Sequence, residues 1–379
     1  MVNIPTLQTT RSNRYKKELD MNHCAKHILK AGWLAGLLLG LSVASCTDLI
    51  YDDRDGCERG VYVNFVYDYN LHRSDLFADH VGEVTLYIFD EQGNYIDSRT
   101  EANDDELQPL REYGYNMYLD LPDGKYRFVA LAHQRKSDDR LRGSFQRTEM
   151  NANSRMEDLQ ITLDHTRLDD GIGLVNHRGE PLDTLWHSIS DRPVEVRQGQ
   201  YAYHTLSLVR NTKYISVVLR DIDEPAAMDI DDYNLYITGG NIRLNHDNSE
   251  DPGIMALCTP YVTWNTHDPD VSNRASTVGN MGHADFMTSR IFAHDNTTDD
   301  EVLVVEHKET GKRVIEVNLP DLLGRLCNYD ELHRYSRQEF LDRGYDYDLT
   351  FFLSDGSWAY ANVSIGVLGW SKRIQNVAL

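Results

Sequence analysis

From residue 61 onward the chain consists largely of short runs in which apolar positions recur every second residue. In the first run, Val61, Val63, Phe65 and Tyr67 fall on the same side of an extended chain. This period of two is typical of a pleated strand with one buried face. Further short strands are expected at 84–89, 159–163 and 194–196, with no long amphipathic helix between them. The pattern therefore predicts a β-sandwich for the first part of the chain.

Turn-forming residues predict two hairpins inside this sandwich. Asp90 to Asn94 follows the strand at 84–89 and leads into Tyr95 and Ile96. Pro122-Asp123-Gly124 separates an alternating run at 117–121 from an apolar run at 126–131. Asp, Asn, Gly and Pro at these positions favour tight turns between antiparallel strands.

A second series of strands begins near Tyr203, and we place the domain boundary at residue 200. These strands are expected at 206–210, 214–219, 233–238, 302–305, 314–319 and 347–353. The polar segments 135–153 and 245–300 predict long surface loops. Residues 331–343 predict a short helix, in which Leu332, Tyr335, Phe340 and Leu341 can share a face. The prediction is thus an all-β protein with two tandem sandwiches, at 57–200 and 201–379.

The N-terminal 45 residues predict a secretory signal rather than part of either domain. Lys26 and Lys30 precede an apolar run from Ala31 to Val43, which is too short for the roughly 20 residues of a membrane-spanning helix. Residues 1–20 are polar, and Met21 is the better initiator. An ordinary cleaved signal that ends beside a cysteine is the alternative to the acylated one considered next.

Val43-Ala44-Ser45-Cys46 resembles the bacterial lipobox, in which the cysteine is acylated and becomes the first residue of the mature protein. Cys46 is therefore the predicted lipidation site, and acyl chains would hold the protein to a membrane. Residues 46–56 carry four aspartates and predict a hydrated tether. Asp52 to Gly56 also resembles part of a calcium loop, but it lacks the terminal bidentate glutamate.

Charge and cysteine content narrow the range of functions. The net charge is −22, which argues against nucleic acid or an anionic membrane surface as an electrostatic partner. Three cysteines, Cys57, Cys258 and Cys327, would remain besides Cys46 after export, so one disulfide is possible and its pairing is open. No Cys/His spacing for zinc and no GxGxxG, GxSxG, HExxH or P-loop sequence occurs. We therefore expect no enzyme activity, no metal and no cofactor.

His/Asp pairs and tyrosines are weaker candidates for a catalytic or binding site. His246-Asp247 and His267-Asp268 are adjacent pairs, which in loops are usually solvated charges. Tyr113, Tyr115 and Tyr118 could stack on sugars or contact a protein, although tyrosines more often cover strand faces. A hydrolase would need acid and base groups that meet only in the fold.

The strand pattern at 57–70, the runs at 77–78 and 84–90, and Leu121 to Tyr126 resemble the FimB/Mfa family of minor fimbrial anchor subunits. Gln338 to Leu353 and the late Gly369-Trp370 are similar to the C-terminal part of that family. The resemblance implies two transthyretin-like β-sandwich domains in a lipoprotein of the outer membrane at the base of a type V fimbria. It also implies that the protein holds the fimbrial stalk subunits and limits the length of the fimbria.

A fimbrial subunit can use an open sheet edge to accept a strand from its neighbour. We expect such strand addition here, with 206–219 or the C-terminal strand at 365–377 as candidate edges. The alternative is a surface lipoprotein that binds glycans or host proteins through Tyr113 to Tyr118 or the 245–300 segment.

Overall fold

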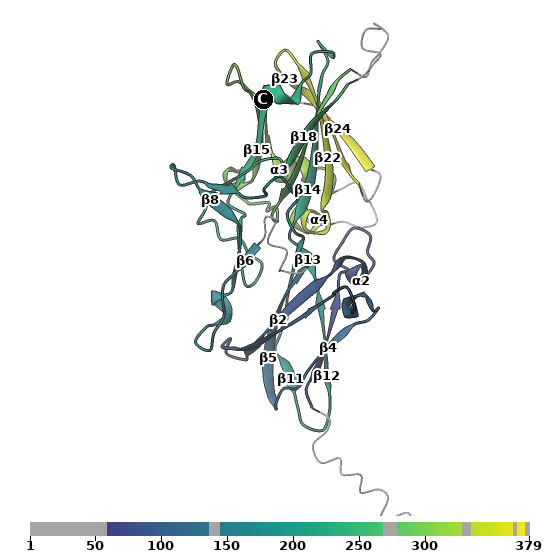
Figure 1. The fold of residues 1–379 in the computed structure, drawn as a ribbon, viewed down its shortest axis with the longest axis vertical. Helices are drawn as coiled ribbons and strands as arrows, with labels where there is room; N and C mark the ends of the chain where they lie inside the picture. The colour runs from purple at the N-terminus through teal and green to yellow at the C-terminus, as the bar shows by residue number, and fades with distance from the viewer. Residues whose placement is uncertain (1–58, 136–144, 268–278, 328–334, 367–369, 376–379) are drawn as a thin grey trace, which may run out of the picture. The chain divides into compact units, whose positions relative to one another are not determined.

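The computed structural model describes residues 59–135, 145–267, 279–327, 335–366 and 370–375. Within these ranges nearly all regular structure is β, with three short helices and four 3₁₀ turns. The strands form two sandwiches, and Figure 1 shows β2 and β5 in the first and β14 and β22 in the second. The predicted fold class is confirmed.

Two sheets enclose the core of the first sandwich. The smaller has the order β12-β1-β4, and the larger has the order β13-β10-β5-β2-β3, with β11 also paired to β5. Their apolar side chains, from Val61 and Phe65 to Phe128 and Trp186, form one buried cluster. The strands are β1 (Val61–Val66), β2 (Glu83–Asp90), β3 (Tyr95–Ala102), β4 (Asn116–Leu119), β5 (Gly124–His133), β10 (Leu185–Ile189), β11 (Val194–Val196), β12 (Ala202–Ser207) and β13 (Val209–Arg210).

Strand β2 is buried on both faces, which explains its nearly continuous apolar sequence. Val84, Leu86 and Ile88 belong to the core of the first sandwich, whereas Tyr87 and Phe89 belong to a second apolar cluster. That second cluster includes residues of the sheet β16-β7-β6. This sheet consists of β6 (Phe145–Arg147), β7 (Gln160–Leu163) and β16 (Arg243–Asn245).

The second sandwich consists of two six-stranded sheets, which bury Ile215, Phe286 and Phe351 from one sheet with Ile237 and Leu303 from the other. One sheet has the order β18-β19-β14-β22-β23-β24 and the other β21-β20-β15-β17-β9-β8. Their strands are β8 (His165–Arg167), β9 (Gly173–Val175), β14 (Lys213–Asp221), β15 (Tyr233–Gly239), β17 (Ala256–Cys258), β18 (Val262–Thr266), β19 (Met281–Thr288), β20 (Val302–His307), β21 (Arg313–Asn318), β22 (Asp346–Ser354), β23 (Ser357–Ile365) and β24 (Trp370–Gln375).

The strand pairings cross residue 200 in both directions. Strands β12 and β13 follow residue 200 but pair with β1 and β10 of the first sandwich. Strands β8 and β9 precede it, yet β9 pairs with β17 of the second sandwich. Each sandwich therefore contains strands from both sides of that position.

One of the two predicted hairpins is confirmed and the other is wrong. Strands β2 and β3 pair antiparallel across the turn that begins at Asp90. Strand β4 instead pairs with β1, while β5 pairs with β2, so Pro122 to Gly124 carries the chain from one sheet to the other. The Tyr126 hydroxyl donates to the Pro122 carbonyl at 2.8 Å and stabilises this crossing. Leu121 and Tyr126 are buried in the same core whether the two runs form a hairpin or belong to different sheets. The alternation of apolar residues therefore could not distinguish these two arrangements.

The predicted surface loop at 245–300 is also wrong in part, because it contains strands β17, β18 and β19. Strand β19 buries Ala284 and Phe286 completely at the centre of the second sandwich. Its buried face is built partly from small residues, which a search for large apolar side chains overlooks. The predicted loop at 135–153 likewise contains β6.

Three short helices complete the fold: α2 (Phe77–His80), α3 (Leu319–Gly324) and α4 (Arg337–Arg343). Helix α4 covers the second half of the helix predicted at 331–343 and buries Phe340 and Leu341. Tyr335 precedes the helix, and Leu332 lies outside the described residues. The Ser336 hydroxyl accepts from the Glu339 amide and caps its first turn. The 3₁₀ turns are η1 (Pro109–Arg111), η2 (Met156–Asp158), η3 (Ile230–Asp232) and η4 (Thr297–Asp299).

Candidate functional site

Cys46, the predicted lipidation site, lies outside the described residues, together with the acidic tether and Cys57. Cys258 and Cys327 are buried free thiols and do not pair with each other. Burial raises the pKa of the Cys258 thiol to about 12, so this thiol stays protonated. None of the helices in the described ranges is long and apolar enough to span a membrane.

The first strand of the sandwich is enclosed on both sides by the chain's own strands. Val61 to Val66 pairs parallel with Ala202 to Ser207, and Val61 to Asn64 pairs antiparallel with β4. The inward side chains Val61, Val63 and Phe65 are almost completely buried. Strand β1 therefore has no free edge, so a strand from another subunit would have to pair elsewhere.

The two segments predicted as assembly edges, 206–219 and 365–377, each include a strand at the edge of its sheet. In the 206–219 segment, β12 and β13 end their sheets, whereas β14 is interior between β19 and β22. In the C-terminal segment, β23 is interior and β24 is the last strand of its sheet. Strands β12 and β24 thus offer unpaired backbone groups in the described structure, whereas β13, with two residues, offers too short an edge for strand addition.

Beside the β12 edge, four tyrosines form a tyrosine face on the outside of the small sheet: Tyr62, Tyr118, Tyr201 and Tyr203. Tyr203, Tyr62 and Tyr118 lie opposite one another across β12, β1 and β4. The ring centroid of Tyr62 is 5.1 Å from that of Tyr118 and 5.5 Å from that of Tyr203. Tyr203 remains 74% exposed. Such rings can contact a partner at low entropic cost.

The predicted tyrosine candidates have different environments. Tyr113 is 89% exposed, whereas Tyr115 is part-buried and stacks on Phe65 and Phe77. Tyr118 belongs to the tyrosine face and donates to the Arg59 carbonyl at 3.0 Å. Of the three predicted tyrosines, Tyr113 and Tyr118 thus contribute to the aromatic surface, and the sequence pattern did not single out Tyr62, Tyr201 and Tyr203.

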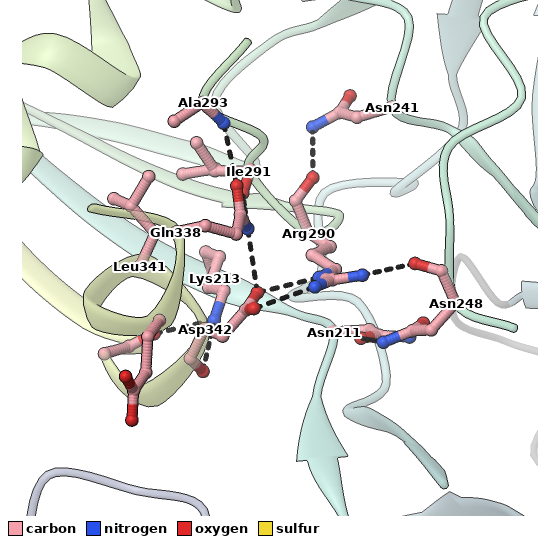
Figure 2. A network of polar contacts seen from close by, with 12 residues as sticks. Asn211, Lys213, Asn241, Asn248, Arg290, Ile291, Ala293, Gln338, Leu341 and Asp342 are labelled. Atoms are coloured by element: carbon pink, nitrogen blue, oxygen red, sulfur yellow. Dashed lines mark hydrogen bonds and ion pairs between the residues drawn. The ribbon is translucent and has the colours of Figure 1, made fainter. Parts of the chain in front are cut away.

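Where the chain passes from β13 into β14, buried polar groups form a network that we call the polar joint (Figure 2). Its central amine, Lys213, is completely buried at the start of β14. Lys213 Nζ donates to the carbonyls of Asp342 and Gly344, at 3.0 and 2.7 Å. These carbonyls lie at the C-terminal end of α4, where carbonyls lack intrahelical partners. Burial lowers the pKa of Lys213 to about 7 despite the nearby Asp342.

A buried ion pair forms the second part of the polar joint (Figure 2). Arg290 Nε and Nη2 each lie 2.7 Å from one carboxylate oxygen of Asp342. Only 14% of the Arg290 side chain and 7% of the Asp342 side chain are exposed. Gln338 donates to Asp342 at 3.0 Å and accepts from the Ala293 amide at 2.8 Å. The pair therefore fixes α4 against the segment that follows β19.

The third part of the polar joint reaches the first sandwich. The amides of Asn211 and Asn248 exchange two hydrogen bonds, at 2.6 and 3.1 Å. The backbone amide of Asn211 donates to the Leu185 carbonyl in β10. Close by, His187 Nε2 lies 2.8 Å from the His246 carbonyl. Burial lowers the pKa of His187 to about 4, so the ring is neutral and donates this bond.

The histidines and acidic residues of the described ranges make several separate polar contacts. His246 contributes its carbonyl and Asp247 bonds to Ser249, while Asp268 lies outside the described residues. His294 lies between Glu250 and Asp300, at 2.7 and 3.0 Å. Burial lowers the pKa of His294, but bonds to these two carboxylates outweigh burial and raise it. In the part of the chain with described structure, no three His, Cys, Asp or Glu side chains are placed to hold a metal ion.

Comparison with known proteins identifies relatives of this chain. In sequence, it is 34% identical over 71 residues to the minor fimbrium anchoring subunit Mfa2 of Porphyromonas gingivalis, a match that spans 19% of this chain and 22% of that relative. In structure, it resembles a Bacteroides thetaiotaomicron protein that is described, provisionally, as polysaccharide-binding. That match has a TM-score of 0.66 and 28% identity, and covers 84% of this chain and 99% of the other.

The fold is also that of the P. gingivalis fimbrial anchor protein Mfa2, with a TM-score of 0.60 at 17% identity over 85% of this chain and 100% of the other. A family profile described as "Fimbrillin-A associated anchor proteins Mfa1 and Mfa2" matches residues 54–376. Because this match covers well over half of the sequence, the chain belongs to the Mfa2 family of fimbrillin-A-associated anchor proteins.

Proposed function

We propose that this protein is a non-enzymatic lipoprotein that anchors a fimbria to the outer membrane and helps to limit its length. The observation that carries this proposal is its membership of the anchor family over nearly the whole exported chain. Cys46 would bear the acyl chains, and more than one chain is needed for stable attachment. Stalk subunits would be the partners, joined by strand addition.

The enclosed β1 supports a terminal role in the fimbria. A subunit whose first strand already pairs on both sides does not need a donated strand to complete that sheet. Strand addition would instead use the open edges of β12 or β24, where unpaired main-chain groups supply affinity and alternate side chains supply register. The proposal therefore predicts one stable contact with the stalk at one of these two edges.

The first test replaces Cys46 by alanine in the native bacterium, with Cys24→Ala as the matched control in the signal region. We expect Cys46→Ala to release the protein from the membrane fraction and to leave fimbriae detached or abnormally long. Cys24→Ala should leave both unchanged. Normal fimbriae on Cys46→Ala cells would contradict the anchor function.

A second test locates the assembly edge. Proline removes a main-chain donor, so Thr205→Pro in β12 or Lys372→Pro in β24 should weaken stalk retention at the edge that is used. Ser98→Pro in β3, an edge strand of another sheet, is the control. Circular dichroism confirms that each variant folds. Full retention of the stalk by both folded variants would contradict strand addition at these edges.

The tyrosine face favours a second candidate function, binding of glycans or host proteins at the cell surface. Exposed, mutually stacked rings are a suitable surface for sugars. A glycan array probed with the wild type and Tyr203→Ala separates the two functions. Glycan binding lost in Tyr203→Ala, with fimbriae unchanged in Cys46→Ala, would favour this function over anchoring.

A further inference from the structure

A cavity of about 340 Å³ lies next to the polar joint, where the first and second sandwiches meet in sequence. The end of β5, the loop before β10 and the end of β13 contribute to its wall, as do the beginnings of β14 and β22. Its volume lies at the lower end of the range of small-molecule sites. The lining residues relevant here are Gln134, Arg210, Tyr214, Tyr261, Tyr345 and Asp346.

Arg210 is the unusual member of this wall. Only 9% of it is exposed, and its Nε has no hydrogen-bond partner among the described residues. Its contacts are with aromatic rings: the guanidinium carbon lies 4.1 Å from the ring centroid of Tyr345 and 5.8 Å from that of Trp186. Buried arginines are normally paired with a carboxylate. In the described structure, Arg210 forms no ion pair with a carboxylate, and it lines the cavity.

Two further aromatic residues lie beside Arg210. Tyr67 and Trp186 pack there, with their ring centroids 5.6 Å apart. Within the described ranges, neither Tyr67 Oη nor Trp186 Nε1 has a hydrogen-bond partner. The Trp186 N–H and the guanidinium can only donate, whereas the Tyr67 hydroxyl can donate or accept, so donors outnumber acceptors among these three groups. An acceptor that bears negative charge complements such a wall best.

The remaining wall suits the body of a sugar. Tyr345, Tyr214 and Tyr261 supply aromatic surface, and Gln134 and Asp346 supply polar groups for hydroxyls. Burial and Asp348 raise the pKa of Asp346, and the positive charge of Arg210 lowers it. A cavity of this size accommodates a single small residue better than an extended peptide strand.

From this geometry we infer that the cavity binds a sugar acid, such as a hexuronic acid, with its carboxylate on Arg210 and its ring beside Tyr345. The planar guanidinium can donate two parallel hydrogen bonds to a carboxylate, and the tyrosine ring holds it in place. This site is separate from the strand edges proposed for assembly and from the tyrosine face. It would let the protein hold an acidic glycan while it is attached to a fimbria.

The test is calorimetric titration of the detergent-solubilised full chain with D-glucuronate, D-glucose and a short peptide that ends in a free carboxylate. We expect glucuronate to bind in the millimolar range or tighter, and glucose to bind at least about tenfold more weakly because it lacks the charged acceptor. Equal binding of glucose, no binding of glucuronate, or tighter binding of the peptide would overturn the proposal.

Variants test the assignment of Arg210. Arg210→Gln should weaken glucuronate binding at least about tenfold, while Arg197→Gln, at an exposed arginine just after β11, should have no effect. If Arg210→Gln does not fold, Asp346→Asn provides the second test. It keeps the guanidinium and removes a nearby negative charge, so it should bind glucuronate at least as well as the wild type. Unchanged binding in folded Arg210→Gln, or loss of binding in folded Asp346→Asn, would refute the site.

Discussion

The ion pair between Arg290 and Asp342 provides the sharpest test of the polar joint. Both side chains are largely buried, and two bonds of 2.7 Å join them. Replacement of Asp342 by asparagine keeps the size and one acceptor oxygen, but it leaves the Arg290 charge buried without a counter-charge. Breaking one side of such a pair typically costs 3–5 kcal/mol, so we expect Asp342→Asn to lower the free energy of unfolding by about that amount.

Urea unfolding, followed by tryptophan fluorescence, measures this loss. With a slope of about 2–3 kcal/mol per molar urea, the midpoint should fall by roughly 1–2 M. Asp321→Asn is the matched control, because Asp321 forms a 2.8 Å ion pair with Arg325 at the surface. An exposed pair contributes less than about 1 kcal/mol, so this control should barely move the midpoint.

A double variant separates the cost of an unpaired charge from the loss of the contact itself. Arg290→Met combined with Asp342→Leu removes both charges and keeps apolar volume. Replacing a buried pair by apolar residues is often neutral, so the double variant should be less destabilised than Asp342→Asn alone. The reasoning is refuted if Asp342→Asn costs no more than Asp321→Asn, or if the double variant is the least stable of the three.

Three further predictions concern buried groups outside this pair. The pKa of Lys213 is about 7 in the folded chain and 10.5 without burial, so the unfolded chain binds more protons between these pH values. The stability of the wild type relative to Lys213→Met should therefore rise by up to about 1.4 kcal/mol per pH unit from pH 7 to 10, and urea titrations at several pH values would measure this rise. Gly60→Ala would place a Cβ 2.3 Å from the Leu119 carbonyl oxygen, so it should lower the free energy of unfolding by about 1–3 kcal/mol more than Gly199→Ala does. Gly199 also has a positive φ, but no atom lies within 4 Å of its Cβ position, and thermal unfolding compares the two variants. The Cys258 thiol should resist alkylation at pH 8 until urea unfolds the chain, and mass spectrometry that finds it modified in the folded protein would contradict its burial.

Much of the β structure could be predicted because burial on one face leaves a direct trace in the sequence. The alternation of apolar and polar residues predicted strand β1, and the turn at Asp90 predicted the pairing of β2 with β3. The order of strands in the sheets left no such trace. The parallel pairing of β1 with β12 joins residues about 140 positions apart, and no local pattern specifies a partner at that distance.

The candidate sites were predictable to different degrees. Cys46 could be proposed because a lipobox is a contiguous motif, whereas the tyrosine face depends on register: Tyr62, Tyr118 and Tyr203 meet only because three strands align. In the sequence, Arg210 is only the last residue of the strand predicted at 206–210. Its lack of an acidic partner depends on which carboxylates the fold brings near it, so the sequence could not single it out.

The polar joint shows why a buried lysine can survive in a strand that otherwise follows the apolar pattern. An unpaired ammonium would be too costly in the interior, yet the carbonyls that Lys213 needs lie 129 and 131 residues later, at the end of α4. These carbonyls, in turn, would be left without partners if a different element packed there. In this arrangement of α4 on β14 each side satisfies the other, so a packing that separates them would leave buried polar groups unpaired. The joint thus disfavours alternative packings at the place where the chain passes from one sandwich to the next, where apolar contacts alone would discriminate less between neighbouring registers.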